Sequence, residues 1–78
     1  MHTTNRSALA SARSLIEVIR NSRSLGLAER NTAMAERYIA LLLDCGLIDR
    51  PQFEERTVEA EMAFSRWLAE TDIDQVLV

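Results

Sequence analysis

Residues 46–52 read Gly-Leu-Ile-Asp-Arg-Pro-Gln, and this stretch predicts the end of one helix and the start of the next. Gly46 can adopt the left-handed conformation that closes a helix. Asp49 is a good N-cap, and Pro51 fits a first helical turn because its missing N–H is not needed there. Gln52, three residues after Asp49, completes a capping box. We therefore expect a helical hairpin at this turn.

The chain on both sides of this turn has apolar residues at helical spacing, and strand-type alternation is scarce. The pattern predicts helices over about residues 5–24, 28–45 and 50–70, followed by a short apolar tail at 74–78. The linkers are only two to five residues long, so neighbouring helices are expected to run antiparallel. The predicted fold class is all-α, a small three-helix bundle.

Each predicted helix has one apolar face. The first carries Leu9, Ala12, Ile16 and Ile19, with Thr4 or Asn5 as its cap and Gly26 as its stop. The second carries Leu27, Met34 and Leu41, with Tyr38, Leu42 and Cys45 on the adjoining row, and its N-cap is left open between Ser24, Asn31 and Thr32. The third carries Phe53, Ala60, Phe64, Trp67 and Leu68. These faces are expected to form the core.

The residue counts exclude several classes of enzyme. All nine basic residues are arginines, so Schiff-base chemistry and a phosphate-binding lysine are excluded. The only glycines, Gly26 and Gly46, are too far apart for a glycine-rich phosphate loop. The single histidine, His2, lies at a chain end, where residues are often frayed. We therefore predict a protein that is not an enzyme and that binds no cofactor.

Cysteine and carboxylate usage adds two expectations. One cysteine, Cys45, cannot form an internal disulfide, which favours a reducing cytoplasm, and we expect it to be a small buried residue. The longest apolar stretch, residues 38–43, is much shorter than the roughly 20 residues of a membrane span. Glu55 and Glu59 share a helix face, but no Glu-x-x-His motif accompanies them, so no metal site is predicted.

Charge is divided unevenly along the chain, although the net charge is only −3. Residues 1–43 hold six arginines and three acids, whereas residues 44–78 hold three arginines and nine acids. Arg6, Arg13 and Arg20 are seven residues apart and form one stripe on the first helix, which Arg23 extends. This arginine stripe is the best candidate surface for phosphate, an acidic protein or nucleic acid.

Apolar residues are left over once a single core is filled. Leu43, Val58 and Met62 lie off the main faces, which predicts a two-fold homodimer. A partner protein is expected to meet either the arginine stripe or an apolar groove formed by Met34, Tyr38, Val58 and Met62. The function predicted is that of a small cytoplasmic adaptor, inhibitor or regulatory protein. The alternatives are a nucleic-acid-binding dimer that uses the arginine stripe, or an accessory subunit of a multi-subunit enzyme or particle.

Residues 39–56 read Ile-Ala-Leu-Leu-Leu-Asp-Cys-Gly-Leu-Ile-Asp-Arg-Pro-Gln-Phe-Glu-Glu-Arg. The order of helix, glycine, Leu-Ile and acidic helix start resembles short oligomerising modules such as the SHOCT family. This resemblance covers under a third of the chain. It implies a helical hairpin, and no function is transferred from it.

Overall fold

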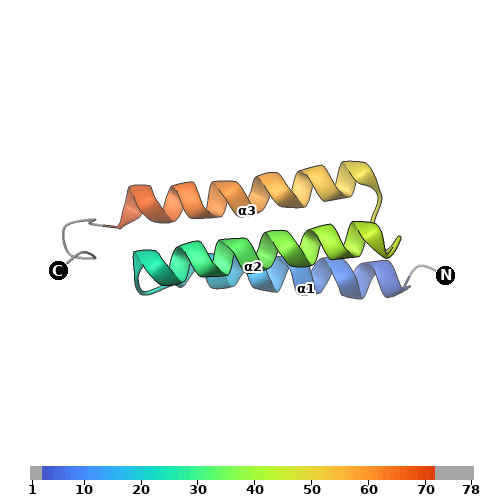
Figure 1. Ribbon diagram of the computed structural model, residues 1–78, viewed down its shortest axis with the longest axis horizontal. Helices are drawn as coiled ribbons and strands as arrows, with labels where there is room; N and C mark the ends of the chain where they lie inside the picture. The colour runs from blue at the N-terminus through green and yellow to red at the C-terminus, as the bar shows by residue number, and fades with distance from the viewer. Residues whose placement is uncertain (1–2, 72–78) are drawn as a thin grey trace.

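A computed structural model describes the backbone of residues 3–71 and the side chains of residues 6–71. Three helices account for most of this part of the chain, namely α1 (Thr3–Arg20), α2 (Leu25–Asp44) and α3 (Arg50–Glu70). Each helix packs against both of the others, and α2 runs antiparallel to α1 and α3 (Figure 1). The prediction of an all-α three-helix bundle is confirmed. The predicted apolar tail and His2 lie outside the described residues.

The first turn differs from the prediction. Helix α1 begins at Thr3, before the expected caps, and it ends at Arg20 instead of continuing to Ser24. Ser24 has extended backbone angles and its hydroxyl accepts a hydrogen bond from the Leu27 N–H at 3.2 Å, so Ser24 is the N-cap of α2. Gly26 therefore lies inside the first turn of α2, and the prediction that it stops the first helix is wrong.

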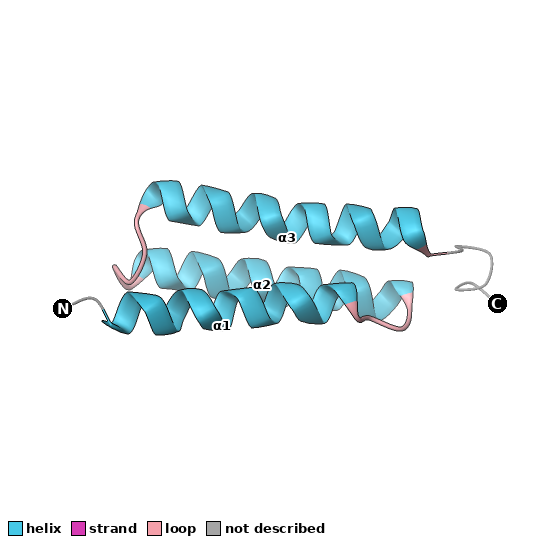
Figure 2. Cartoon of the chain, turned by 180° about the vertical axis from the view of Figure 1, so that it is seen from behind, coloured by secondary structure: helices cyan, strands magenta, loops and turns pink. Residues whose placement is uncertain are grey.

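The second turn has the predicted geometry. Gly46 has a φ of +75°, and the N–H groups of Gly46 and Leu47 donate to the carbonyls of Leu43 and Leu42 at 3.0 and 2.9 Å. This double hydrogen bond is the Schellman arrangement that closes a helix. The Asp49 carboxylate then accepts from the Gln52 N–H, while the Gln52 side chain accepts from the Asp49 N–H. Together these bonds fix the α2–α3 hairpin, which Figure 2 shows from behind.

The core is built mainly from alanine and isoleucine. Its buried residues are Ala8, Ala12, Ile16, Ile19, Ala35, Ile39, Leu42, Ile48, Ala60 and Ala63. The predicted face of the first helix is confirmed, since Ala12, Ile16 and Ile19 are buried and Leu9 packs against them. Alanine has no side chain beyond Cβ, so alanines at helix contacts let the backbones approach closely. Ile19 and Ile39 are the largest fully buried side chains in the core.

The predicted core face of the second helix is wrong for most of its residues, although Leu42 is buried and Tyr38 packs against the core as expected. Leu27, Met34 and Leu41 are 43%, 51% and 54% exposed, whereas the neighbouring row Ala28, Ala35, Ile39 and Leu42 is buried. Both rows repeat every seven residues and are offset by one position, so either could face the bundle. The row that contains the two alanines faces inward, because its small side chains permit close packing against α1 and α3.

Two further expectations on α2 are wrong for the same reason, because α2 turns a different face toward the core than predicted. Cys45, expected in the core, is exposed as the C-cap of α2, because it continues the outward row. Leu43, expected to be surplus apolar surface, is half-buried and packs against the core. Val58 and Met62 on α3 are exposed, as their positions predict.

Trp67 joins the α1–α2 turn to α3. Its indole Nε1–H donates to the carbonyl oxygen of Ser22 at 2.8 Å, and only 6% of the tryptophan is exposed. The hydroxyl of Ser22 accepts from the Asn31 amide at 2.9 Å and donates to the Val18 carbonyl at 3.1 Å. Ser22 thus links all three helices at one end of the bundle, and this link fixes the alignment of α1 along α3.

Candidate functional site

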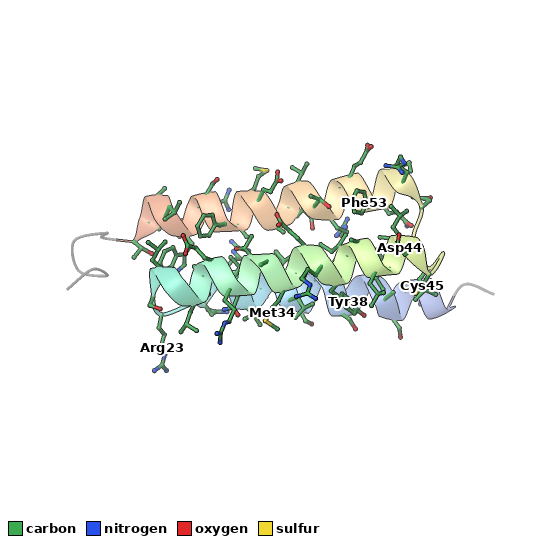
Figure 3. All side chains as sticks on the ribbon, viewed as in Figure 1. Arg23, Met34, Tyr38, Asp44, Cys45 and Phe53 are labelled. Atoms are coloured by element: carbon green, nitrogen blue, oxygen red, sulfur yellow. The ribbon has the colours of Figure 1, made fainter. Side chains whose placement is uncertain are left out.

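The arginine stripe lies on the exposed side of α1. Arg6, Arg13 and Arg20 are all exposed, and their seven-residue spacing separates successive side chains by about 10 Å along the helix axis. Arg23 is exposed too, but it lies beyond the end of α1 and points away from the bundle (Figure 3). The stripe on the helix therefore consists of three arginines instead of four.

A groove lies between α1 and α3 beside this stripe, with a volume of about 350 Å³. The wall from α1 consists of Arg13, Ile16, Glu17 and Arg20. The wall from α3 consists of Glu59, Met62, Ala63 and Arg66. Because the two helices run parallel, the bundle brings the second half of α1 beside the second half of α3 (Figure 2). We call this hollow the arginine groove.

Two of its arginines carry charges that no carboxylate of the described side chains neutralises. Arg20 lies 3.8 Å from Glu17, and Glu59 is held by Arg56 at 3.0 Å. Arg13 and Arg66 form no ion pair with any side chain of residues 6–71. Arg13 comes from one wall of the arginine groove and Arg66 from the other, so both guanidinium groups are available to an anion that enters it.

The base of the arginine groove is apolar. Ile16 and Ala63 are buried core residues that reach the groove from opposite helices, and the thioether of Met62 is exposed at its edge. Methionine is flexible and polarisable, so it adapts to ligands of different shape. The groove therefore combines two free guanidinium groups with an apolar surface. This combination suits a ligand that carries an acidic group next to an apolar one.

A second hollow continues along α1. It has a volume of about 370 Å³ and is lined by Arg6, Leu9, Ala10 and Arg13. Arg13 contributes to both hollows, so the surface extends over more than two turns of α1. This continuity fits an elongated ligand better than a small compact one.

The apolar residues predicted to form one groove are divided between two surfaces. Met62 lines the arginine groove, and Val58 is exposed one turn before it on α3. Met34 and Tyr38 lie on α2, where they point to the side away from α3 (Figure 3). Met34 is exposed and Tyr38 is half-buried against the core. The structure brings Met62 to the arginines and leaves Met34 and Tyr38 on a separate face.

Sequence reasoning missed two arginines of α3. Arg66 faces Arg13 and Arg20 only because α1 and α3 are aligned as they are, and no sequence pattern reveals that alignment. Arg56 could have been found, because it falls at helical spacing between Phe53 and Ala60 on the apolar face of α3. Its side chain is only 13% exposed, and its guanidinium group pairs with Glu55 at 3.1 Å and with Glu59 at 3.0 Å. Arg56 thereby neutralises the carboxylate at the groove edge.

Two other features of the described residues concern metal ions and membranes. Among the side chains of residues 6–71, no three from His, Cys, Asp and Glu lie close enough together to hold a metal ion. None of the three helices has the length and apolar content needed to cross a bilayer.

The chain was also compared with known proteins. No model of a protein family, no curated protein and no solved structure matches it.

Proposed function

We propose that this chain is a small, non-catalytic interaction protein that binds an acidic segment of another protein in the arginine groove. The observation that carries the proposal is the pair of unneutralised guanidinium groups, Arg13 and Arg66, on opposite walls of one hollow. Two arginines that converge from two helices can hold one carboxylate by several charge-assisted hydrogen bonds. A protein of this kind acts as an adaptor, inhibitor or regulator because it covers part of its partner.

The apolar base of the groove favours a protein segment over an isolated anion. A partner side chain such as leucine, next to the acidic residue, would cover Met62 and Ile16 and remove apolar surface from water. Burial of one such side chain contributes roughly 1.5 to 3 kcal/mol, which is as large as the contribution of a charge-assisted hydrogen bond. Affinity in this scheme comes from both parts of the groove.

The spacing of the stripe suggests the form of the segment. Successive arginines of the stripe are about 10 Å apart, and a polyproline II segment rises about 3.1 Å per residue with three residues per turn. Such a segment with an acidic residue at every third position presents its carboxylates on one side, close to the spacing of Arg6, Arg13 and Arg20. The residues between them can fill the apolar base.

Nucleic acid fits the groove less well than a protein does. Glu17 and Glu59 both line the hollow, and a phosphate backbone would meet their carboxylates as well as the arginines. The whole chain also has a net charge of −3, which opposes non-specific binding to a polyanion. A peptide whose acidic residues are separated by apolar ones can place its carboxylates at the arginines and its uncharged residues beside Glu17 and Glu59.

A cytoplasmic location is part of the proposal. Cys45 is a free, exposed thiol, and such a group persists in a reducing compartment.

The test is selection of a randomised peptide library against the immobilised chain, followed by affinity measurements on the enriched peptides. We expect these peptides to contain aspartate or glutamate with apolar residues between, and to bind Arg13→Ala and Arg66→Ala about tenfold or more weakly, as expected for a lost charge-assisted contact. Arg23→Ala is the matched control, because it removes the same charge from an exposed position outside the groove. The control should bind like the wild type.

Two results would overturn the proposal. The first is enrichment of peptides without acidic residues, or of peptides that bind Arg13→Ala and wild type equally. The second is tight binding of duplex DNA with an affinity that falls steeply with salt, which would instead support the nucleic-acid alternative.

A further inference from the structure

Helix α2 carries a second, mostly apolar face beside its row of buried core residues. Residues along this face are spaced by four and three in alternation, and none of them is buried: Leu27, Asn31, Met34, Tyr38, Leu41 and Cys45. This spacing is the seam pattern of coiled coils, in which two helices pack along their length. We call these six residues the α2 seam.

The α2 seam has a different neighbour on each side. The core row that contains Ala28 and Ala35 borders it on one side. On the other side lies a charged row with the same seven-residue repeat, formed by Arg30, Arg37 and Asp44. A seam bordered by charged residues is typical of a helix that meets another helix at the surface. In Figure 3, Met34 and Tyr38 mark the middle of the seam, on the side of α2 away from α3.

We propose that a second copy of this chain covers the α2 seam, with the two α2 helices antiparallel about a two-fold axis. In this register Leu27 faces Cys45 of the second copy, and Met34 faces Tyr38 of the second copy. The remaining layer pairs Asn31 with Leu41 of the second copy. Each layer thus joins residues from opposite halves of the seam, so the surface is complementary to itself, as a two-fold interface requires.

The polar atoms of the seam are compatible with this packing. The Asn31 amide already donates to the Ser22 hydroxyl at 2.9 Å, so this hydrogen bond is formed before the second copy approaches. A parallel arrangement would instead place Tyr38 against Tyr38 and Asn31 against Asn31. The antiparallel register sets each of these residues against a flexible aliphatic side chain.

The charged row supports the same orientation. Neither Arg30 nor Asp44 takes part in an ion pair within the described chain. The antiparallel register places Arg30 beside Asp44 of the second copy, and the two-fold axis repeats this pair. Arg37 lies near the axis and meets its own symmetry mate, which is an unfavourable charge contact within the charged row. Removal of that charge should therefore tighten the dimer.

The dimer leaves the arginine groove open. That groove is lined by α1 and α3, whereas the contact proposed here uses α2 alone. Each dimer would therefore present two arginine grooves. The inference goes beyond the proposed function, and either proposal can fail without the other.

The test is disulfide formation in the variant Leu27→Cys. Leu27 and Cys45 are separated by 18 residues of one helix, a distance of about 27 Å, so a bond between these two positions must join two chains. We expect mild oxidation of Leu27→Cys to produce a covalent dimer. The double variant Leu27→Cys with Cys45→Ser should stay monomeric on a denaturing gel. Ala33→Cys, on the opposite side of the exposed surface of α2, should cross-link much more slowly.

The outcomes distinguish the orientations. Two results would indicate parallel helices and overturn the antiparallel register. One is rapid cross-linking of the wild type through Cys45, and the other is rapid cross-linking of the double variant through position 27. Equal cross-linking of Leu27→Cys and Ala33→Cys would overturn the face.

Sedimentation equilibrium provides a second readout that does not depend on disulfides. We expect a wild-type dimer, an affinity at least tenfold weaker in Leu41→Glu, and an affinity up to about threefold tighter in Arg37→Ala. Leu41 is exposed, so circular dichroism should show an intact fold in Leu41→Glu. A monomeric wild type at all accessible concentrations would refute the proposal.

Discussion

Replacement of Arg56 by methionine should stabilise the bundle. The Arg56 side chain is 13% exposed, and its buried Nε–H has no hydrogen-bond partner within the described chain. An unsatisfied buried donor costs about 1 to 3 kcal/mol. Methionine keeps the apolar stem and removes this donor.

The ion pairs of Arg56 offset only part of that cost. Its partners Glu55 and Glu59 are 63% and 42% exposed, so solvent screens both interactions. Exposed pairs of this kind contribute about 0.2 to 1 kcal/mol each. We therefore expect Arg56→Met to raise the free energy of unfolding by about 1 kcal/mol, which is the difference between the two effects.

The assay is urea unfolding followed by circular dichroism at a fixed, low protein concentration. With a slope of about 1 kcal/mol per molar urea for a chain of this size, the midpoint should rise by about 1 M. Glu55→Gln serves as the control for the loss of a single ion pair, and its midpoint should move by less than half as much. A midpoint for Arg56→Met below that of the wild type would refute the argument, because it would show that the ion pairs outweigh the buried donor.

Other predictions concern the turns and the end of the bundle. Gly26→Ala should stabilise the chain by about 0.5 to 1 kcal/mol, because an added Cβ in the first turn of α2 meets no atom within 4 Å. Gly46→Ala should destabilise the chain by about 1 to 2 kcal/mol, because the φ of +75° disfavours any residue with a Cβ. Thermal unfolding measures the stability of both glycine variants. A change of the same sign in the two variants would contradict this reasoning. Trp67→Phe should cost about 1 to 3 kcal/mol and accelerate amide exchange near Ser22, since it leaves that carbonyl without its donor. Unchanged exchange there would show that the indole bond does not hold the turn.

Arg56 also connects stability with the proposed function. It neutralises Glu59, whose carboxylate would otherwise lie unpaired at the edge of the arginine groove. Arg56→Met should therefore weaken the binding of acidic peptides while it stabilises the fold. A residue that costs stability but improves a binding site is a common compromise in proteins.

Local sequence signals predicted the helices well where a side chain bonds to the nearby backbone. The Asp49 capping box and the Gly46 turn depend on residues within a few positions of each other, so the sequence contains all the information that they need. Gly26 misled the prediction because glycine is compatible with both a helix stop and a helix start. The Ser24 hydroxyl bond to Leu27 decided in favour of the start.

The choice of the core face of α2 could not be made from apolarity alone. Leu27, Met34 and Leu41 are more apolar than the neighbouring alanines, yet they face outward. The interior of three tightly packed helices selects residues by volume as well as by apolarity, so Ala28 and Ala35 are preferred there. The same error hid part of the α2 seam, because Leu27, Leu41 and Cys45 had been assigned to the core alone.

The arginine groove was predicted in part. The seven-residue spacing of Arg6, Arg13 and Arg20 identified two residues of the α1 wall, Arg13 and Arg20, from sequence. The opposite wall depends on how α1 and α3 are aligned, and that alignment is set by long-range contacts such as the Trp67 bond to Ser22. Arg66 could be placed only once this alignment was known.

The most direct test of the account is an NMR titration of the isotope-labelled wild-type chain with an acidic peptide from the selection. We expect the largest chemical-shift changes on Arg13, Arg66 and their neighbours in the arginine groove, including the guanidinium Nε–H signals. Residues of the α2 seam such as Leu41 should change little. Shift changes centred on the α2 seam, with none at Arg13 and Arg66, would contradict it.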